Sequence, residues 1–257
     1  MKLFKKPFVL FPAALALCLG FPGLTGADEG GTKAQPQLFV AQVKGKVYVV
    51  HGQDQHPANP PEALAESDQI KTGPDSRAYL EFQDGGVVEV GPESAVAVRN
   101  LDITPDHFKA RFLLAWGKFR AKVKKLAGAS SSFEVQAGGV VAGVRGTVFG
   151  VDYDKAKSRV DTQTFEGSIF ARAGGREQVV DKGYSMAVEK TGLSVKSPLT
   201  GQQMNGFRDF VDVSGQLEKK KQELLRQMHD KLMDRMPDPV KQHEDDLRNT
   251  LGNKLPF

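Results

Sequence analysis

The fold is decided by the stretch Val140-Val141-Ala142-Gly143-Val144-Arg145-Gly146-Thr147-Val148-Phe149-Gly150-Val151. It is apolar, rich in β-branched residues and interrupted by glycine, which is typical of buried strands. One charge lies near its middle, and a buried charge is costly unless it is paired or hydrogen-bonded. Strand alternation places Val144, Gly146 and Val148 on one face, opposite Arg145. We interpret Arg145 as a structural clamp that donates hydrogen bonds, with ligand binding as the alternative.

Strand-like segments continue on both sides of this stretch, over residues 38–198. The runs 47–50, 77–82, 87–90 and 95–98 are β-branched or aromatic and are separated by clusters of Gly, Asp, Pro and Ser. Asp84-Gly85-Gly86 predicts a tight turn between two of them. Residues 53–66 contain three prolines and predict a loop. The chain is therefore expected to be mainly β.

Three short segments resemble one another, and each centres on a glycine: Val43-Lys44-Gly45-Lys46-Val47, Ala115-Trp116-Gly117-Lys118-Phe119 and Phe165-Glu166-Gly167-Ser168-Ile169. A glycine before a short alternating strand suits a chain that turns a corner and re-enters a sheet. The recurrence favours a β-solenoid or β-roll in which successive coils stack. A β-sandwich with recurrent glycine turns is the alternative.

Residues 1–27 have the features of an export signal. Lys2, Lys5 and Lys6 precede an apolar run, and small residues end at Ala27. A membrane anchor is the alternative, although the apolar run is shorter than a spanning helix needs. Leu17 occupies the place where a lipoprotein box needs a small residue, which argues against lipidation at Cys18. We expect a flexible leader at 28–37 and a periplasmic or outer-envelope location.

The charge balance excludes nucleic acid as an expected partner. The chain has 35 basic and 31 acidic residues, and three of the lysines lie in the export signal. The remainder is nearly neutral, so no basic surface is predicted. Cys18 is the only cysteine, and its loss with the signal would remove thiol chemistry and cysteine-bound metals. No second apolar stretch is long enough to span a membrane.

The polar residues suggest no catalytic site. The five histidines are scattered, without metal-ligand spacing. Asp152, Asp154 and Asp161 could hold calcium or act as paired carboxylates, but lysines among them favour a solvated turn. The basic segment 118–125 could contact anionic lipid or glycan, or form a solvated strand face. We therefore expect no enzyme activity, no cofactor and no metal.

The chain changes character after Pro198, with a predicted linker at 199–206 and a helical tail at 207–251. Pro237-Asp238-Pro239 divides the tail, and a short second helix is expected at 240–251. Glu218 with Lys221 could pair along the first helix. The apolar stripe of this helix could pack on the β region, self-associate as a coiled coil or bind a protein partner. Its candidate partner-binding residues are Leu217, Leu224, Met228 and Leu232.

The β region resembles the FecR domain family. The segment 67–78 resembles the family's central motif, although Ser67 stands where glycine is usual. The segment 82–90 resembles the following hairpin, 144–149 the most specific signature, and 164–169 the closing strand. The motif residues, which we interpret as structural, are Asp68, Thr72, Gly73, Gly85, Arg145, Gly146, Thr147 and Gly167.

The resemblance implies an envelope module that binds or signals and does not catalyse. In regulators of iron uptake the domain hangs from a membrane helix whose cytoplasmic side restrains a sigma factor. This chain shows no internal membrane helix, so only the module is expected to carry over. We expect a non-enzymatic exported protein that binds or scaffolds a protein partner in the envelope. The alternative is an accessory in envelope signal transduction that senses or relays with a membrane partner.

Overall fold

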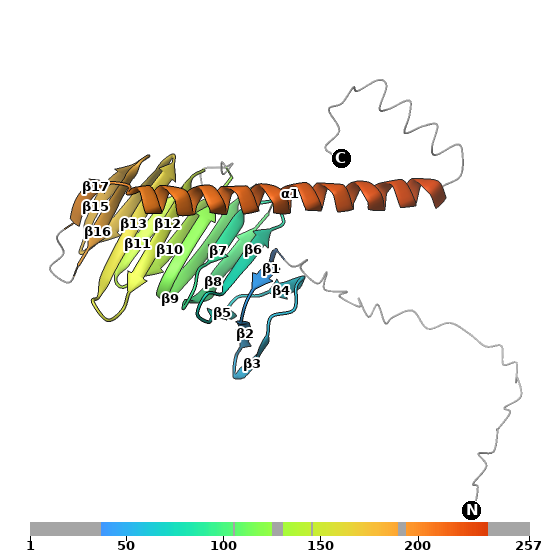
Figure 1. The fold of residues 1–257 in the computed structure, drawn as a ribbon, viewed down its shortest axis with the longest axis horizontal. Coiled ribbons are helices and arrows are strands. Elements are labelled where there is room, and N and C mark those ends of the chain that lie inside the picture. The colour runs from blue at the N-terminus through green and yellow to red at the C-terminus, as the bar shows by residue number, and fades with distance from the viewer. Residues whose placement is uncertain (1–36, 105, 125–130, 145, 190–193, 236–257) are drawn as a thin grey trace, which may run out of the picture. The chain divides into compact units, whose positions relative to one another are not determined.

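The computed structural model describes residues 37–104, 106–124, 131–144, 146–189 and 194–235. These residues form seventeen strands followed by one helix, α1 (Gly201–Arg235) (Figure 1). The mainly β prediction is confirmed. The export signal, the leader up to residue 36, Arg145 and the expected second helix at 240–251 lie outside the described residues.

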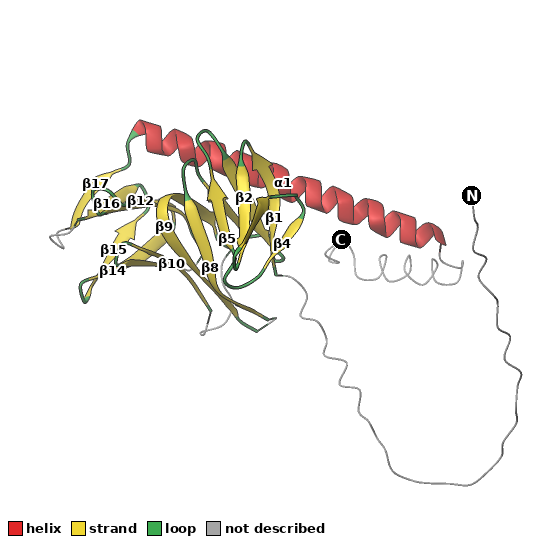
Figure 2. Cartoon of the chain, turned by 90° about the horizontal axis from the view of Figure 1, so that it is seen from below, coloured by secondary structure: helices red, strands yellow, loops and turns green. Residues whose placement is uncertain are grey.

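The strands form two sheets that face each other (Figure 2). Sheet A has the order β4 (Glu62–Leu64), β1 (Leu38–Lys44), β6 (Arg77–Phe82), β7 (Val87–Val90), β9 (Phe108–Lys122), β12 (Val148–Asp154), β13 (Arg159–Glu166), β16 (Tyr184–Val188) and β17 (Ser194–Pro198). Sheet B has the order β3 (Asp54–Pro57), β2 (Val47–His51), β5 (Gln69–Thr72), β8 (Ala95–Ile103), β9, β10 (Ser132–Ala137), β11 (Val140–Val144), β14 (Ser168–Ala173) and β15 (Arg176–Asp181).

Strand β9 belongs to both sheets. Residues 108–116 pair with β8 in sheet B, and residues 117–122 pair with β12 in sheet A. Gly117 lies where the strand changes sheet, and its φ is +98°. Gly45 and Gly167 lie at two further crossings, β1 to β2 and β13 to β14, with φ of +75° and +76°. Each glycine of the recurrent motif therefore turns a corner between the sheets, because it tolerates a positive φ that other residues resist.

Each of these glycines also packs against a hydroxyl-bearing residue of a neighbouring corner. A Cβ at Gly45 would lie 2.5 Å from Ser76 Oγ, and one at Gly117 would overlap Ser94. A Cβ at Gly167 would lie 2.5 Å from the side chain of Thr147. Distances this short are closer than real contacts allow, so these corners exclude any side chain.

Two of these contacts repeat in atomic detail. Ser76 and Ser94 each end a Gly-Pro-acid-Ser segment, and each hydroxyl donates to the proline carbonyl two residues earlier, at 2.9 and 2.8 Å. Each hydroxyl also accepts the backbone N–H that follows the corner glycine, from Lys46 at 2.9 Å and Lys118 at 2.8 Å. The serine thus replaces the ladder hydrogen bonds that a corner interrupts.

The expected solenoid or roll is not confirmed. Among the described residues, β9 and β10 are the one parallel neighbouring pair, and the other pairs are antiparallel. In a solenoid, the equivalent strands of neighbouring coils would pair in parallel. The observed pattern instead matches the sandwich alternative, and the sheet does not close on itself.

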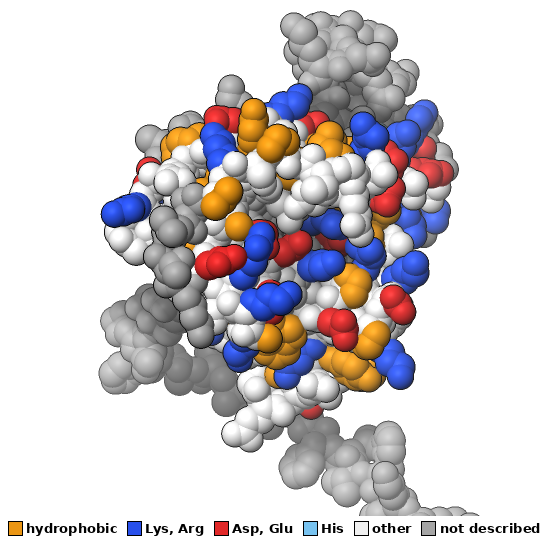
Figure 3. Space-filling view, turned by 60° about the vertical axis from the view of Figure 1, so that its left-hand side comes forward, with side chains coloured by type: hydrophobic (Ala, Val, Ile, Leu, Met, Phe, Trp, Pro, Cys, Tyr) orange, Lys and Arg blue, Asp and Glu red, His pale blue; other side chains and the backbone are white. Residues whose placement is uncertain are grey.

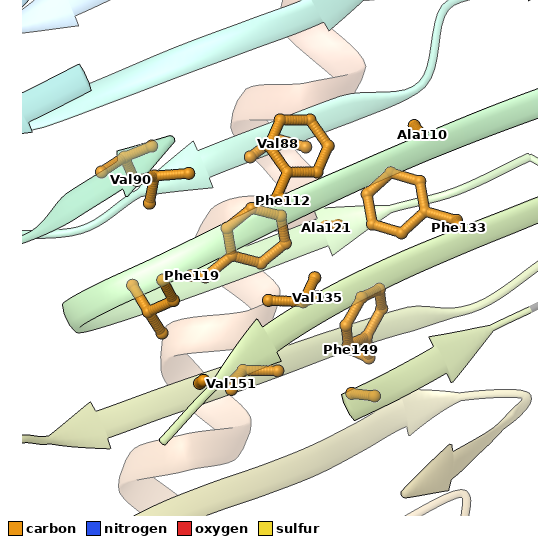
Figure 4. Close-up of a cluster of buried hydrophobic side chains, with 14 of the residues drawn as sticks. Val88, Val90, Ala110, Phe112, Phe119, Ala121, Phe133, Val135, Phe149 and Val151 are labelled. Carbon is orange, nitrogen blue, oxygen red and sulfur yellow. The ribbon is translucent and has the colours of Figure 1, made fainter. Parts of the chain in front are cut away.

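The core lies between the two sheets and is built around phenylalanine. Phe112 and Phe119 of β9 lie 5.4 Å apart between ring centroids, and Phe133 of β10 lies 5.6 Å from Phe112 (Figure 4). Phe149 of β12 meets Phe133 edge-on at 5.9 Å. All four side chains have no more than 1% of their surface exposed. Aromatic contacts from both halves of β9 therefore join the layers.

The stretch 140–151 is not one continuous strand. It forms β11 in sheet B and the start of β12 in sheet A, so the single alternation expected across residues 144–149 is wrong. Val144 and Phe149 both face the core between the sheets, whereas Val148 packs in a second cluster beneath α1. Gly146 has a φ of +73° and resets the alternation at this corner.

Two predicted boundaries also need correction. Helix α1 begins at Gly201, so most of the predicted linker 199–206 is helical. Thr200 caps the helix, because its hydroxyl accepts the N–H of Gln203 at 3.3 Å and the Gln203 side chain accepts the N–H of Thr200 at 2.8 Å. The predicted loop 53–66 contains the short edge strands β3 and β4, where proline is tolerated.

Because Gly117 packs tightly against Ser94, we expect Gly117→Ala to lower the free energy of unfolding by more than the cost of a positive φ alone. A left-handed conformation costs an alanine about 1–2 kcal/mol, and the overlap with Ser94 adds about 1–3 kcal/mol. Gly139→Ala is the matched control, because Gly139 has a φ of +86° with nothing within 4 Å of its Cβ position. Urea unfolding should show a clearly larger loss for Gly117→Ala; equal losses would contradict the contact.

Candidate functional site

Helix α1 lies across the outer face of sheet A and continues beyond β1 (Figures 1 and 2). Phe207 and Phe210 are fully buried, and Leu217 is 8% exposed. They pack with Tyr79 and other residues of the outer face, and the rings of Phe207 and Phe165 stack at 5.5 Å. The first half of α1 therefore belongs to the folded domain.

A buried ionic cluster lies beneath this part of the helix. The Glu89 carboxylate is 2% exposed and accepts hydrogen bonds from Arg77 at 2.8 Å and Arg120 at 2.7 Å. The Arg120 guanidinium lies over the Phe207 ring at 5.5 Å. Burial, followed by the charge of Glu89, raises the pKa of Tyr79 to about 12. The two arginines pair with the Glu89 carboxylate, which α1 covers from water. We therefore interpret the cluster as structural.

Ion pairs hold α1 where it reaches the edge of the sheet. Lys221 Nζ lies 2.9 Å from Glu81 and donates to the Gln83 carbonyl at 3.1 Å. Glu218 lies 3.6 Å from Lys124 and 4.0 Å from Lys122. Glu218 and Lys221 therefore pair with the sheet and not with each other as expected. The basic residues 120, 122 and 124 of the segment 118–125 face this helix or its ion pairs.

The same helix face continues past the sheet but is exposed there. At 100° per residue, the buried positions 207, 210, 214 and 217 share one side with four later apolar residues. These four are 51–60% exposed: Leu224, Leu225, Met228 and Leu232. We refer to them as the overhang face. Of the four candidate partner-binding residues, Leu217 is used within the domain, and the other three lie on this face.

A groove joins the overhang face to the β domain. It has a volume of about 640 Å³, and its walls are Phe39, Ala41, Val43, Pro60, Pro61, Phe82, Leu217, Leu224 and Leu225, with Gln42, Glu81, Gln83, Lys220 and Lys221 at the polar positions. Strand β1 has a register shift between Val40 and Gln42, beside this groove. A bulge of this kind bends the strand that carries it and changes the direction of its side chains.

The family-motif residues hold the corners of the sandwich. Asp68 is 3% exposed, pairs with His51 at 2.5 Å and accepts the Ala65 N–H at 2.8 Å. The Thr72 hydroxyl donates to a carbonyl of the next corner, that of Gly91, at 2.6 Å.

The remaining described motif residues also lie at turns and corners of the sandwich. The Gly73 N–H donates to the Lys46 carbonyl at 2.9 Å, and Gly85 has a φ of +89° in the β6–β7 hairpin. Thr147 is 3% exposed beside Gly167. Among the described motif residues, none lines the groove; Arg145 lies outside the described range.

The three candidate aspartates line one surface hollow, and Asp152 and Asp161 lie opposite each other on β12 and β13. Asp152 accepts a hydrogen bond from Gln163 at 3.1 Å, and burial raises its pKa. Asp154 is bound by Lys157, whose hydrogen bonds lower the pKa of Asp154. Asp161 pairs with Arg159 at 2.8 Å. Within the part of the chain that the structure describes, no cluster of His, Cys, Asp or Glu is arranged to hold a metal ion.

The face of the molecule that is seen in Figure 3 carries no large patch of one charge sign. On the face shown in Figure 3, lysine and arginine side chains are interspersed with aspartate and glutamate. This mixture agrees with the nearly neutral balance of the chain after residue 27. Across the described ranges, no helix combines the length and the apolar character that crossing a bilayer requires.

The burial of Tyr79 gives a titration that can be measured. The phenol should ionise near pH 10 in the unfolded chain and near pH 12 in the folded one. Its contribution to stability is therefore complete below pH 10 and is lost as the pH rises towards 12. Ultraviolet titration should show one of the four tyrosines ionising last, and Tyr79→Phe should remove that step. A late step that survives Tyr79→Phe would contradict the assignment.

Part of the β region is similar to known proteins. Two crystal structures of a candidate anti-sigma factor from Parabacteroides distasonis are 14% identical to this chain, with a TM-score of 0.45. The alignments cover 53% of this chain and 62% of those chains, so this chain spans less than two thirds of their length. No curated protein matches. A family model described as FecR protein matches residues 68–170, and this segment contains most of the sequence motifs that carry the resemblance to that family.

Proposed function

We propose that this chain is a non-enzymatic binding module of the bacterial envelope, in which the FecR-like β domain is the base and the overhang face of α1 is the docking surface. One observation carries this proposal. The helix face that is buried on sheet A continues past its edge as four half-exposed apolar residues: Leu224, Leu225, Met228 and Leu232. A contiguous exposed apolar face next to a groove is typical of an interaction site.

The size of the overhang face limits how it can bind. Full burial of a leucine or methionine gives about 1.5–3 kcal/mol, so four half-exposed side chains give about 4 kcal/mol in total. Even before the cost of association is subtracted, that corresponds to a dissociation constant of only about 1 mM. A useful affinity therefore requires contacts beyond this face, and the adjoining groove offers them.

The chemistry of the site defines the partner that it fits. An apolar helix face beside an apolar groove suits an amphipathic helix, which binds through residues spaced by three, four and seven. Lys219 and Lys220 are exposed at the groove end, and Lys220 lines the groove, whereas Lys221 is already paired with Glu81. We therefore propose as occupant an amphipathic helix of a partner protein with acidic residues at the groove end.

The similarity to the FecR family favours a role in signal transduction for this binding. A partner that is itself anchored in the membrane would let the module relay envelope state, which is the signalling form of the same activity. The export of the chain rests on the sequence of residues 1–27. Binding and relay thus use one surface and differ only in what the partner does next.

Photo-crosslinking in the native cell tests the docking surface. A photoreactive residue in place of Met228 should give an intermolecular adduct with one protein. Leu224→Lys with Leu232→Lys should reduce that adduct at least tenfold, because both changes place charge on the apolar face. Gln222→Lys with Gln227→Lys adds the same charge to exposed positions off that face and should leave it unchanged. No adduct, or equal loss in both pairs, would overturn the proposal.

A further inference from the structure

We infer that the surface hollow beside Trp116 binds a neutral oligosaccharide. The three candidate aspartates line this hollow, which has a volume of about 460 Å³ and lies within the usual size range of small-ligand sites. It is formed where β9 passes from sheet B to sheet A, beside the end of β12 and the start of β13. It shares no lining residue with the groove at the overhang face, so the inference stands apart from the proposed function.

Trp116 gives the hollow an exposed aromatic surface. Its side chain is 40% exposed, whereas Phe112 and Phe119 of the same strand are fully buried. The pairing of β9 with β8 is irregular beside Trp116, and Gly117 then turns the corner between the sheets. The indole therefore lies at the rim of the sandwich and outside its core, and a ligand that covers it gains free energy from the apolar surface removed from water.

Three neighbouring strands place a row of charged groups beside this ring. Lys118 of β9 lies opposite Asp152 of β12, and Asp152 lies opposite Asp161 of β13. Residues paired in this way point to the same face of a sheet, and neighbouring strands are about 4.8 Å apart. All three residues line the hollow, as does the exposed Glu93. The hollow therefore offers hydrogen-bond donors and acceptors side by side.

An aromatic ring beside mixed donors and acceptors fits the two kinds of surface that a sugar ring presents. The faces of a pyranose carry C–H groups, which pack on an aromatic ring, and its hydroxyls each donate and accept hydrogen bonds. The carboxylates of Asp152 and Glu93 are available to accept from such hydroxyls, and the ammonium of Lys118 is available to donate to them. Hydrogen bonds with one charged partner are about twice as strong as neutral ones.

The charges of the hollow favour a neutral ligand over an ionic one. Its charged lining residues are Glu93, Lys118, Asp152, Asp154, Lys155 and Asp161. Two of these carboxylates are already paired outside the hollow's own lysines, Asp154 with Lys157 and Asp161 with Arg159. The remaining two carboxylates balance the two lysines. The Lys155 ammonium lies over the Trp116 ring, 5.7 Å from its centroid, so a cationic ligand would meet a positive charge there.

The fluorescence of Trp116 tests the site directly, because it is the only tryptophan of the chain. Maltohexaose, cellopentaose and chitopentaose should be titrated separately into the full-length protein, and at least one should change the emission in a saturable way. An oligogalacturonate, which is anionic, should bind at least tenfold more weakly. No saturable change with any neutral sugar, or equal binding of the anionic one, would overturn the inference. A response to tetramethylammonium chloride alone would identify a cation site and would also overturn it.

Calorimetry with the sugar that binds tests the ring and the carboxylate separately. Trp116→Ala should weaken binding at least tenfold, whereas Trp116→Phe keeps an aromatic face and should stay within threefold of the original affinity. Asp152→Asn keeps an acceptor for Gln163 but removes the charge, and it should weaken binding at least threefold. Asp209→Asn is the matched control, because it changes an exposed carboxylate on α1 outside the hollow.

Urea unfolding of each variant shows whether the domain remains folded, which is expected because the Trp116 side chain lies outside the core. Full affinity in a folded Trp116→Ala variant would exclude the ring from the site. Equal affinities of Asp152→Asn and Asp209→Asn would exclude the carboxylate. Either result contradicts the inferred oligosaccharide site.

Discussion

The close contact between corner glycines and serine hydroxyls is the constraint on which the sandwich depends. At Gly45 and Gly117 the chain changes sheet within one residue, and the neighbouring serine fills the space that a Cβ would need. The serine also accepts the next backbone N–H and donates to a proline carbonyl. One side chain therefore fixes two corners at once, and the two sheets keep their register because their corners are tied together.

The helix depends on this base in turn. Sheet A presents Glu89, Arg77 and Arg120 on its outer face, and α1 covers them with Phe207. Charges at this depth are satisfied by one another, and the apolar residues of α1 add the net stabilisation. Lys221 and Glu218 form ion pairs at the sheet edge, where the packing of α1 on sheet A ends. What projects beyond them is the same amphipathic helix without a sheet beneath it.

Much of this architecture could be predicted from local patterns, and the rest depends on distant partners. Alternation and turn residues predict the strands at 47–50, 77–82, 87–90 and 95–98, and the recurrent glycines predict the corners. Sandwich and solenoid differ only in which strands pair, which no local pattern contains. The Thr200–Gln203 capping box was present in the sequence and marks the true start of α1.

The site shows the same division. The stripe of Leu224, Met228 and Leu232 follows from helical spacing, but which part of α1 is covered depends on where sheet A ends. Glu89 has the sequence pattern of a solvent-facing strand residue, and it is buried because a helix more than a hundred residues later lies over it. The groove is equally long-range, since it needs β1, the 60–61 prolines and α1 together.

Strand β9 has a consequence for how the domain can come apart. Because one uninterrupted strand supplies hydrogen bonds to both layers, neither layer can separate without disturbing the other. We therefore expect the two layers to unfold together as one cooperative unit.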